Sequence, residues 1–463
     1  MSVKRTNVIF GTLLCGAIVT SLLQTALTTA LPAIMAELHL GASTAQWLTS
    51  AFSLTMAIMV PATAYLIKRF STRQIFSSAM FLFTLGTFFA WVAPSFPLLL
   101  TGRILQALGS GIILPLLQVV VMTMYPPEKQ GFVMGIYGLA AGAAPVFAPT
   151  LAGFLIGIRG WRSIFLVTLI PSALTLILSL VTINNVSETE KIPFDYLSMV
   201  LCALGMTGLL LGLGNLTSGG LPTTVLPLLL GLLACVFFVR RQLKLSQPFL
   251  DVRAFSDRNF RLAVIISVLL YAVMMGGSTI YPILIQTVMG KSAVVSALVM
   301  LPGSLIMSLI SPRAGRFYDR FGIRALVLAG SLIMLVSCLG VSFVHSSTDI
   351  ALLVALYALR LFAVGCIMMT IVTWGMQKLP ASQVTHGSAL LTSLRTLAGA
   401  FGSAVSMEIM SYASQASVAH QVANYAGVRV AFLSISALAF VQLLVALAAF
   451  GAHSTHGERG SGC

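Results

Sequence analysis

Four ionisable side chains stand inside long apolar stretches of this sequence: Arg103, Arg360, Arg395 and Glu408. A charge in such surroundings is costly, so each should face the inside of a helix bundle and serve a purpose there. An arginine could tune proton or substrate binding in a central cavity, or could tie helices together through a partner such as Gln106. Glu408 is the one acid of eleven that falls in the interior of such a stretch. It could be a proton-coupling carboxylate, or an interfacial residue in contact with water.

A second set of charged residues occurs twice, in two short connections. Segment 64–73 reads AYLIKRFSTR and segment 315–324 reads GRFYDRFGIR, so both have a small residue, a charge, Arg-Phe, a small residue and Arg in register. In the second apolar stretch after each copy there is an arginine: Arg103 after the first copy and Arg360 after the second. A repeat of this kind predicts two related six-helix halves.

The two copies differ at the residue that could do chemistry. The carboxylate of Asp319 could accept hydrogen bonds from helix N-terminal amides and pair with nearby arginines. The alternative is a tight solvated turn in which the two glycines allow close approach. In the first copy Lys68 replaces the acid and could pair with Asp195 or Glu128 instead. The candidate residues of the two loops are Lys68, Arg69, Arg73, Gly315, Asp319, Arg320, Gly322 and Arg324.

Enzyme chemistry finds no support in the sequence. No Ser/His/Asp set, Cys/His pair or phosphate-binding loop occurs at a usable spacing. The six cysteines and six histidines are scattered, without metal-ligand spacing or a disulfide framework. We therefore expect no catalytic activity, no cofactor and no metal.

The composition shows what kind of elements must position these residues. Of 463 residues, 58% are hydrophobic and 8% are charged, whereas globular domains carry roughly 25% charged residues. Such a chain cannot keep its surface in water, which argues against a soluble enzyme, a nucleic-acid binder or a secreted domain. The net charge of +15 would suit nucleic acid only on a soluble basic domain, and none is visible. We assign the excess Lys and Arg to cytoplasmic loops.

Fourteen apolar segments are long enough for spanning helices, which need about 20 residues each. With a cytoplasmic N-terminus, most of the Lys and Arg fall on the cytoplasmic side, including a dense cluster between the eighth and ninth segments. We therefore expect an all-α multi-pass protein of the cytoplasmic membrane with both termini in the cytoplasm. The approximate limits are 8–31, 46–67, 74–93, 97–123, 131–157, 163–183, 195–215, 222–239, 260–287, 293–312, 324–344, 349–374, 385–412 and 427–451.

The repeat divides these segments into units. We expect a six-helix bundle over 1–190, two extra helices with a basic cytoplasmic loop over 191–258, a second six-helix bundle over 259–452, and a short cytoplasmic tail over 453–463.

Several motifs carry a resemblance to a known family. The second copy of the repeat resembles the G-x-x-x-D-R-x-G-x-R/K loop of the major facilitator superfamily. Segment 103–109 (RILQALG) is similar to the family's R-x-x-Q-G-x-G, and segment 144–153 (APVFAPTLAG) to the antiporter signature G-P-x-x-G-P-x-x-G-G. Trp161-Arg162 opens the W-R-x-I-F that follows that signature. With fourteen spans, the chain is identified as a member of the 14-helix drug:proton antiporter family, most similar to its lincomycin-resistance type.

The resemblance implies a fold and a function. The fold would be two pseudo-symmetric six-helix bundles plus two linking helices, and the function would be export of amphipathic, lincosamide-like compounds by alternating access with proton antiport. The residues of the two loop copies would form a conformational latch. Pro145, Pro149 and Gly153 of the signature would form a kinked, closely packed seam. Proton coupling is where this chain departs from the family, because Leu23 stands where many members carry an aspartate.

The charges inside the spans bear on the substrate. Three arginines against at most one carboxylate favour a neutral, zwitterionic or anionic amphiphile over a dication. Export or flipping of an endogenous lipid or other amphiphile remains an alternative, as does a non-transporting membrane receptor or partner subunit. We expect a monomer in contact with membrane lipid, with protons as coupling ion and no nucleic-acid partner. Residues that could line the path, with ordinary packing as the alternative for each, are Gln24, Thr28, Gln118, Tyr271, Tyr281, Gln286 and Trp374.

Overall fold

The computed structural model describes residues 3–183, 195–216, 220–416 and 423–450. In these ranges the chain forms fourteen long α-helices, one for each predicted span, and no strand. The predicted boundary at residue 190 and the predicted tail fall outside the described residues. The helices are α1 (Val3–Leu38), α2 (Ala42–Arg69), α3 (Thr72–Val92), α4 (Phe96–Met124), α5 (Pro127–Arg159), α6 (Arg162–Thr182), α7 (Tyr196–Gly214), α8 (Leu221–Lys244), α9 (Arg258–Ile283), α10 (Ala293–Phe321), α11 (Arg324–Ser342), α12 (Ile350–Gln377), α13 (Ala381–Ala416) and α14 (Ala423–Phe450).

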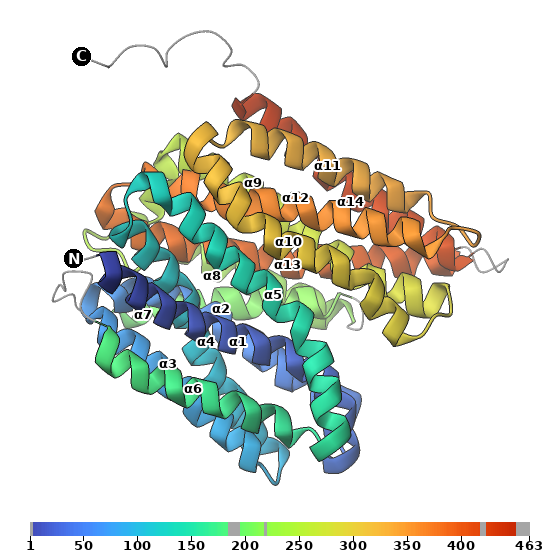
Figure 1. The fold of residues 1–463 in the computed structure, drawn as a ribbon, viewed down its shortest axis with the longest axis horizontal. Coiled ribbons are helices and arrows are strands. Elements are labelled where there is room, and N and C mark those ends of the chain that lie inside the picture. Colours follow the sequence, from blue (N-terminus) through green and yellow to red (C-terminus); the bar gives the residue numbers. More distant parts are fainter. Residues whose placement is uncertain (1–2, 184–194, 217–219, 417–422, 451–463) are drawn as a thin grey trace.

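Apolar length explains why these segments are helices. In lipid every backbone polar group must be bonded internally, and a helix does this within one segment. Twelve of the described helices are by themselves long and apolar enough to cross a membrane. The other two, α5 and α13, have 33 and 36 residues and run alongside them (Figure 1). The chain is a multi-pass membrane protein.

The helices pack as two bundles. Helices α1 to α6 form the first bundle, in which α3 packs on α4 and α6, and α1 on α5. Helices α9 to α14 form the second, in which α13 packs on α9, α10 on α12 and α11 on α14. The bundles meet chiefly along α5 and α10, and also along α2 and α13 (Figure 1).

One end of the molecule, here called the basic end, carries Arg69, Arg73, Arg241, Arg261 and Arg316. The odd-numbered helices begin there and the even-numbered ones end there. At the opposite end, the far end, the ribbons of the two bundles diverge, and α5 bends away from α10 (Figure 1). The predicted bending of this helix is therefore present in its course.

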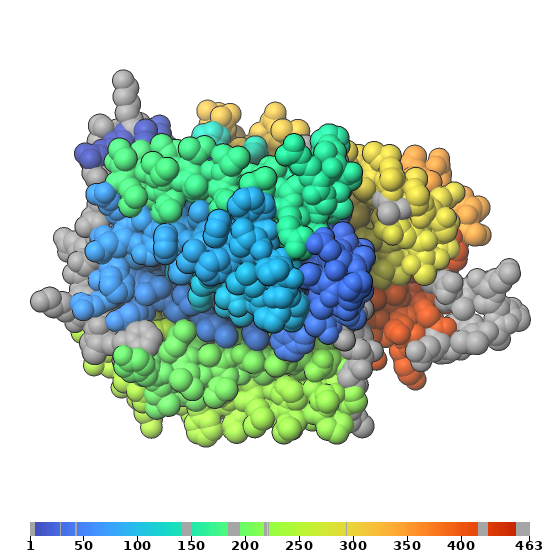
Figure 2. All heavy atoms as spheres, turned by 90° about the horizontal axis from the view of Figure 1, so that it is seen from below, coloured from blue at the N-terminus to red at the C-terminus, as the bar shows by residue number. Residues whose placement is uncertain are grey.

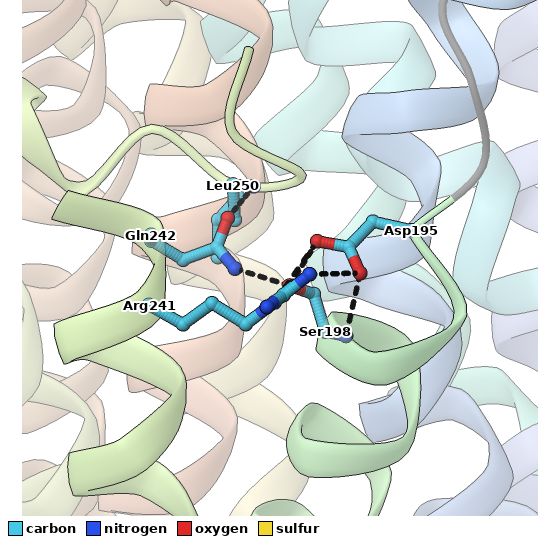
Figure 3. A network of polar contacts seen from close by, with 5 residues as sticks. All are labelled: Asp195, Ser198, Arg241, Gln242 and Leu250. Carbon is cyan, nitrogen blue, oxygen red and sulfur yellow. Dashed lines mark hydrogen bonds and ion pairs between the residues drawn. The ribbon is translucent and has the colours of Figure 1, made fainter. Parts of the chain in front are cut away.

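The extra helices α7 and α8 form a hairpin beside the first bundle (Figure 2). Helix α7 contacts both α2 and α13, so the hairpin spans the seam between the bundles on one side. A polar network holds its basic end together (Figure 3): Arg241 donates to both carboxylate oxygens of Asp195, and Gln242 bonds Ser198 and the amide of Leu250.

This network contains Asp195, a titratable group outside the spans that was predicted to pair with Lys68. Asp195 pairs with Arg241 at 3.0 Å, so the predicted pairing with Lys68 is wrong. Burial alone would raise the pKa of the Asp195 carboxyl, but its bonds from Arg241 and Ser198 outweigh burial and hold the pKa below its usual value. Asp195 also caps α7 by accepting from the amide of Ser198.

Candidate functional site at the contact between the two bundles

Asp319 joins the two bundles at the basic end. It lies in the last turn of α10, and its carboxylate oxygens accept hydrogen bonds from the amides of Gly131 at 2.9 Å and Phe132 at 2.8 Å, in the second turn of α5. A carboxylate near a helix N-terminus is favoured by the helix dipole as well as by these bonds. The predicted contact of this acid with helix amides is present, and it connects one bundle to the other.

Two glycines allow α5 and α10 to approach this closely. A Cβ atom on Gly315 would collide with the carbonyl oxygen of Gly131, and one on Gly131 would collide with the Asp319 carboxylate. Both collisions involve atoms that cannot rotate aside without breaking the contact. Gly322, with φ of 77°, ends α10 in the left-handed region that favours glycine.

A second polar bridge lies beside the first. Gln377, the last residue of α12, accepts a hydrogen bond from the Tyr318 hydroxyl and donates to the carbonyl of Pro127 at 3.1 Å. The Arg316 guanidinium lies over the Phe132 ring, 4.2 Å from its centre. Three helices of the two bundles are therefore bonded together within two turns of the basic end.

The predicted arginine partners of Asp319 are not what holds it. Arg320 and Arg324 are exposed, and no ion pair joins Asp319 to an arginine in the described ranges. The two amides already occupy both carboxylate oxygens, which removes the need for a cation.

The first copy of the repeat does not contact α5. Lys68 is half-buried and lies near enough to His386 of α13 to interact with it electrostatically. Arg73 is exposed and Arg69 half-buried. Neither Glu128, which is exposed near Asp319, nor Asp195 is paired with Lys68 among the described residues.

A third bond between the bundles lies closer to the middle of the molecule. Ser388 of α13 donates to the side chain of Gln118 at 2.8 Å and to the carbonyl of Pro115, both on α4. Gln118 is 2% exposed, so this predicted path residue does lie between the bundles.

Arg103 lies inside the first bundle. It donates to the carbonyl of Leu48 at 3.2 Å and to Gln106 at 2.7 Å, and its guanidinium stacks over the Phe52 ring at 4.2 Å. Gln106 continues the chain of bonds to Thr87 of α3. These contacts join α2, α3 and α4, which is the geometry of a tie between helices.

Arg360 occupies the equivalent place in the second bundle but is bonded less well. It donates to Ser278 at 3.2 Å and lies beside the paired rings of Tyr281 and Tyr357, 5.1 Å from the centre of each. Its Nε and one Nη atom have no partner among the described residues, and the side chain is fully buried. Gly277 leaves room for it, because a Cβ there would overlap the guanidinium.

Arg395 on α13 has a different setting. Its guanidinium lies 4.0 Å over the ring of Tyr271 on α9 and donates to the hydroxyl of the same residue. Glu408, on the same helix, is half-buried and makes no ion pair with another described residue.

The other predicted path residues divide by location. Tyr281 packs against Tyr357 and Phe432, and Trp374 against Phe450, so both lie within the second bundle. Gln286 is exposed in a short π-helical segment, Leu284–Val288, and Gln24 is half-buried. The rings of Tyr281 and Trp374 therefore pack against helices of their own bundle.

The antiporter signature lies on α5, and only part of it is described. The side chains of Thr28, Pro145 and Pro149 lie outside the described residues. The prediction of close packing at Gly153 is wrong, since a Cβ there would meet nothing within 4 Å. Ala148 and Ala152 are buried and border an apolar pocket of about 100 Å³ between α1, α5 and α6, which no predicted path residue lines.

A group of polar bonds joins helices at the far end of the first bundle, and only one side of it could be predicted from the sequence. Arg162 pairs with Glu37 and donates to the carbonyl of Ala93 at 2.7 Å, while the Trp161 indole donates to Glu37 at 2.7 Å. The bond from Arg162 lowers the pKa of the Glu37 carboxyl. The Trp-Arg motif was visible in the sequence, but its acidic partner, 124 residues away from Trp161, was not.

Residues 13–403 match the sequence profile of the Major Facilitator Superfamily, and the chain belongs to this family. An uncharacterized MFS-type transporter of Bacillus subtilis, YcnB, is 38% identical over 445 residues, which are 95% of this chain and 94% of the relative. The lincomycin resistance protein LmrB of Bacillus subtilis is 34% identical over 84% of this chain and 82% of its own. The crystal structure of the human organic anion transporter MFSD10 covers 95% of this chain and 99% of its own with a TM-score of 0.67; at 15% identity it shows the fold alone. The chain is thus a transporter of the major facilitator fold and not an enzyme.

Proposed function

We propose that this transporter exports amphipathic small molecules across the cytoplasmic membrane by alternating access, driven by proton antiport. The observation that carries the proposal is the contact of Asp319 with the Gly131 and Phe132 amides. It joins two bundles that otherwise diverge toward the far end (Figure 1). A few breakable polar bonds at one end are what a two-state transporter needs. The likeness to the lincomycin resistance protein supports drug export.

The orientation follows from the basic end. If this end faces the cytoplasm, as the positive-inside rule requires, both termini are cytoplasmic and the described conformation is closed toward the cytoplasm. Asp319, Gln377 and Ser388 then form the bonds that must open for substrate to enter from inside.

Glu408 is our candidate for the proton-coupling group. It is the one acid in the interior part of the predicted spans, and no arginine is paired with it in the described ranges. Coupled proton flux in proteoliposomes should fall in Glu408→Gln and stay unchanged in Glu128→Gln, an exposed acid at the basic end. Unchanged flux in Glu408→Gln would remove Glu408 from the mechanism.

One experiment tests the function as a whole. An efflux-deleted bacterial host that expresses the chain is exposed to a panel of amphipathic drugs, lincosamides included, with and without a protonophore. We expect protection against some compounds that the protonophore abolishes and that Asp319→Asn reduces. No protection against any compound would favour an endogenous lipid or other amphiphile as the substrate, which the excess of inner arginines also fits.

A further inference from the structure

We propose that Arg395, held over Tyr271, anchors an acidic group of the transported amphiphile, so that the substrate class is an organic anion with an apolar body. The inference rests on the proposed transport function and names the substrate chemistry for it. It starts from the different surroundings of the three inner arginines.

Two of the three arginines are closed off within their own bundles. Arg103 is 1% exposed and its bonds all go to α2 and α4. Arg360 is fully buried beside Tyr281 and Tyr357 and donates a hydrogen bond to Ser278 of α9. Neither one contacts a residue of the opposite bundle through a described hydrogen bond or ring contact. A substrate that passes between the bundles does not reach these two guanidinium groups.

Arg395 lies on the face of α13 that looks toward the other bundle. It is seven residues beyond Ser388, and residues spaced by seven lie on the same face of a helix. Ser388 bonds Gln118 and the Pro115 carbonyl on α4, which fixes that face toward the first bundle. Tyr137 of α5 is close enough to interact electrostatically with both Arg395 and Tyr271. Arg395 is therefore at the seam between the bundles.

The described hydrogen bonds between the bundles end before the level of Arg395 is reached. Seven residues of helix rise about 10 Å, so Arg395 lies that far beyond Ser388 toward the far end. The described hydrogen bonds that join the bundles, at Asp319, Gln377 and Ser388, all lie on the basic side of this level. Toward the far end the ribbons of the two bundles diverge (Figure 1). Arg395 is itself 5% exposed in this conformation, so a group binds its guanidinium only when the two bundles move apart.

The guanidinium has unused capacity to bind an anion. An arginine offers five N–H donors, and the structure gives Arg395 one hydrogen bond, to the Tyr271 hydroxyl. No acid in the described ranges pairs with it, and Glu408, on the same helix, is about 20 Å away along the axis. Stacking on the Tyr271 ring holds the plane of the guanidinium, as bidentate recognition of a carboxylate or phosphate requires.

The test measures binding of a matched pair of probes to the full-length protein purified in detergent. The probes are 11-(dansylamino)undecanoate and its uncharged carboxamide, which share the same apolar body, and the signal is the change in dansyl emission. Hydrogen bonds to a charged group predict that the wild type binds the acid about tenfold more tightly than the amide. Equal affinity for the two probes in the wild type overturns the proposal without any variant.

Three substitutions sharpen the test. Arg395→Gln should bring the two affinities together by weakening the acid alone, and Arg395→Lys, which keeps the cation, should retain a preference for the acid. Arg360→Gln removes a positive charge that is buried inside the second bundle. This variant should therefore prefer the acid over the amide as strongly as the wild type does. Elution volume and melting temperature confirm that each variant folds. A preference that survives in Arg395→Gln, or that is lost equally in Arg360→Gln, overturns the assignment.

The outcome separates this inference from the proposed function. Drug export in cells with no preference for the acid would overturn the anion anchor and leave the exporter standing. A preference for the acid that depends on Arg395, without export of any drug, would support the anchor and overturn drug export.

Discussion

The two copies of the repeated loop face the opposite bundle with opposite charges. In the second copy the Asp319 carboxylate accepts two amides of α5 across the seam. In the first copy Lys68 lies near His386 of α13, and the polar bonds of that loop are local: Ser71 caps α3 and exchanges bonds with Gln74. The loop of Asp319 is hydrogen-bonded to the opposite bundle. The loop of Lys68 instead places a cation close to the buried imidazole of His386.

This difference shows that two loops with similar sequences need not contribute equally to the contact between the bundles. The copies also differ at the small residue that opens the motif. Gly315 lies against the backbone of Gly131, whereas its counterpart Ala64 is buried within the first bundle and tolerates a methyl group. If the contact between the bundles depends on one copy alone, matched substitutions in the two loops must give unequal effects.

The largest difference is expected for the opening small residues. Gly315→Ala places a methyl group onto the carbonyl of Gly131, so α5 and α10 must separate, at a cost of about 3 kcal/mol. Ala64→Gly costs about 1 kcal/mol of helix stability and leaves the seam alone. Opening is measured as maleimide labelling of Ser311→Cys, a buried position on α10 that contacts Gly135 and Gly138 of α5. Labelling should accelerate about a hundredfold in Gly315→Ala and little in Ala64→Gly; equal rates would refute the asymmetry.

The charged residues of the two loops should give the next largest difference. Asp319→Asn replaces a charge-assisted contact with a neutral one, a loss of about 2 kcal/mol. Transport of a compound found in the susceptibility panel should therefore fall at least tenfold. Lys68→Ala removes a cation that has no acidic partner among the described residues, and transport should change less than threefold. Similar losses in the two variants would show that the first copy carries as much of the contact as the second.

The sequence predicts the helices of this site and the chemistry of Asp319, but not the residues on α5 that Asp319 contacts. The fourteen helices follow from apolar length, which is a local property, and the chemistry of Asp319 follows from an acid at a helix end beside glycines. Its partners on α5 lie 187 and 188 residues away, and no local signal selects them. The arginine partners were expected because they are neighbours in sequence. Arg320 at the end of α10 and Arg324 at the start of α11 are instead exposed, and neither pairs with Asp319 in the described ranges.

Side-chain direction explains the remaining errors. Tyr281 and Trp374 are polar aromatics in spanning helices, which fits either a path or a core. Only the packing of Tyr281 on Phe432 and of Trp374 on Phe450 shows that both face α14. Gln118, predicted by the same reasoning, does face the other bundle because Ser388 of α13 lies opposite it.

A smaller effect on opening of the seam is expected at Gln377, whose bonds lie beside the contact made by Asp319. Gln377→Leu removes the bonds to Tyr318 and to the Pro127 carbonyl, worth about 1 kcal/mol together. Labelling of Ser311→Cys should rise about fivefold. Gln442→Leu is the control, because this buried glutamine bonds Ser331 within the second bundle and should lower the melting temperature without changing the labelling rate. A rate that is unchanged in Gln377→Leu would show that this bridge does not help to hold the bundles together.

The smallest effect is expected for the Asp195–Arg241 pair, and it tests whether this pair stabilises the α7–α8 hairpin independently of both loops. Because the folded pKa of Asp195 lies below its ordinary value, its pairing with Arg241 stabilises the hairpin above the unfolded pKa of about 4 and is lost as the pH falls below it. The pair is partly exposed, so the gain is about 0.5 kcal/mol. Hydrogen exchange at the Ser198 amide, corrected for its intrinsic rate, should be about twofold faster at pH 3 than at pH 6 and independent of pH in Asp195→Asn. The labelling of Ser311→Cys should be the same in Asp195→Asn as in the wild type; if it rises, the hairpin that contacts both α2 and α13 contributes to closing the seam.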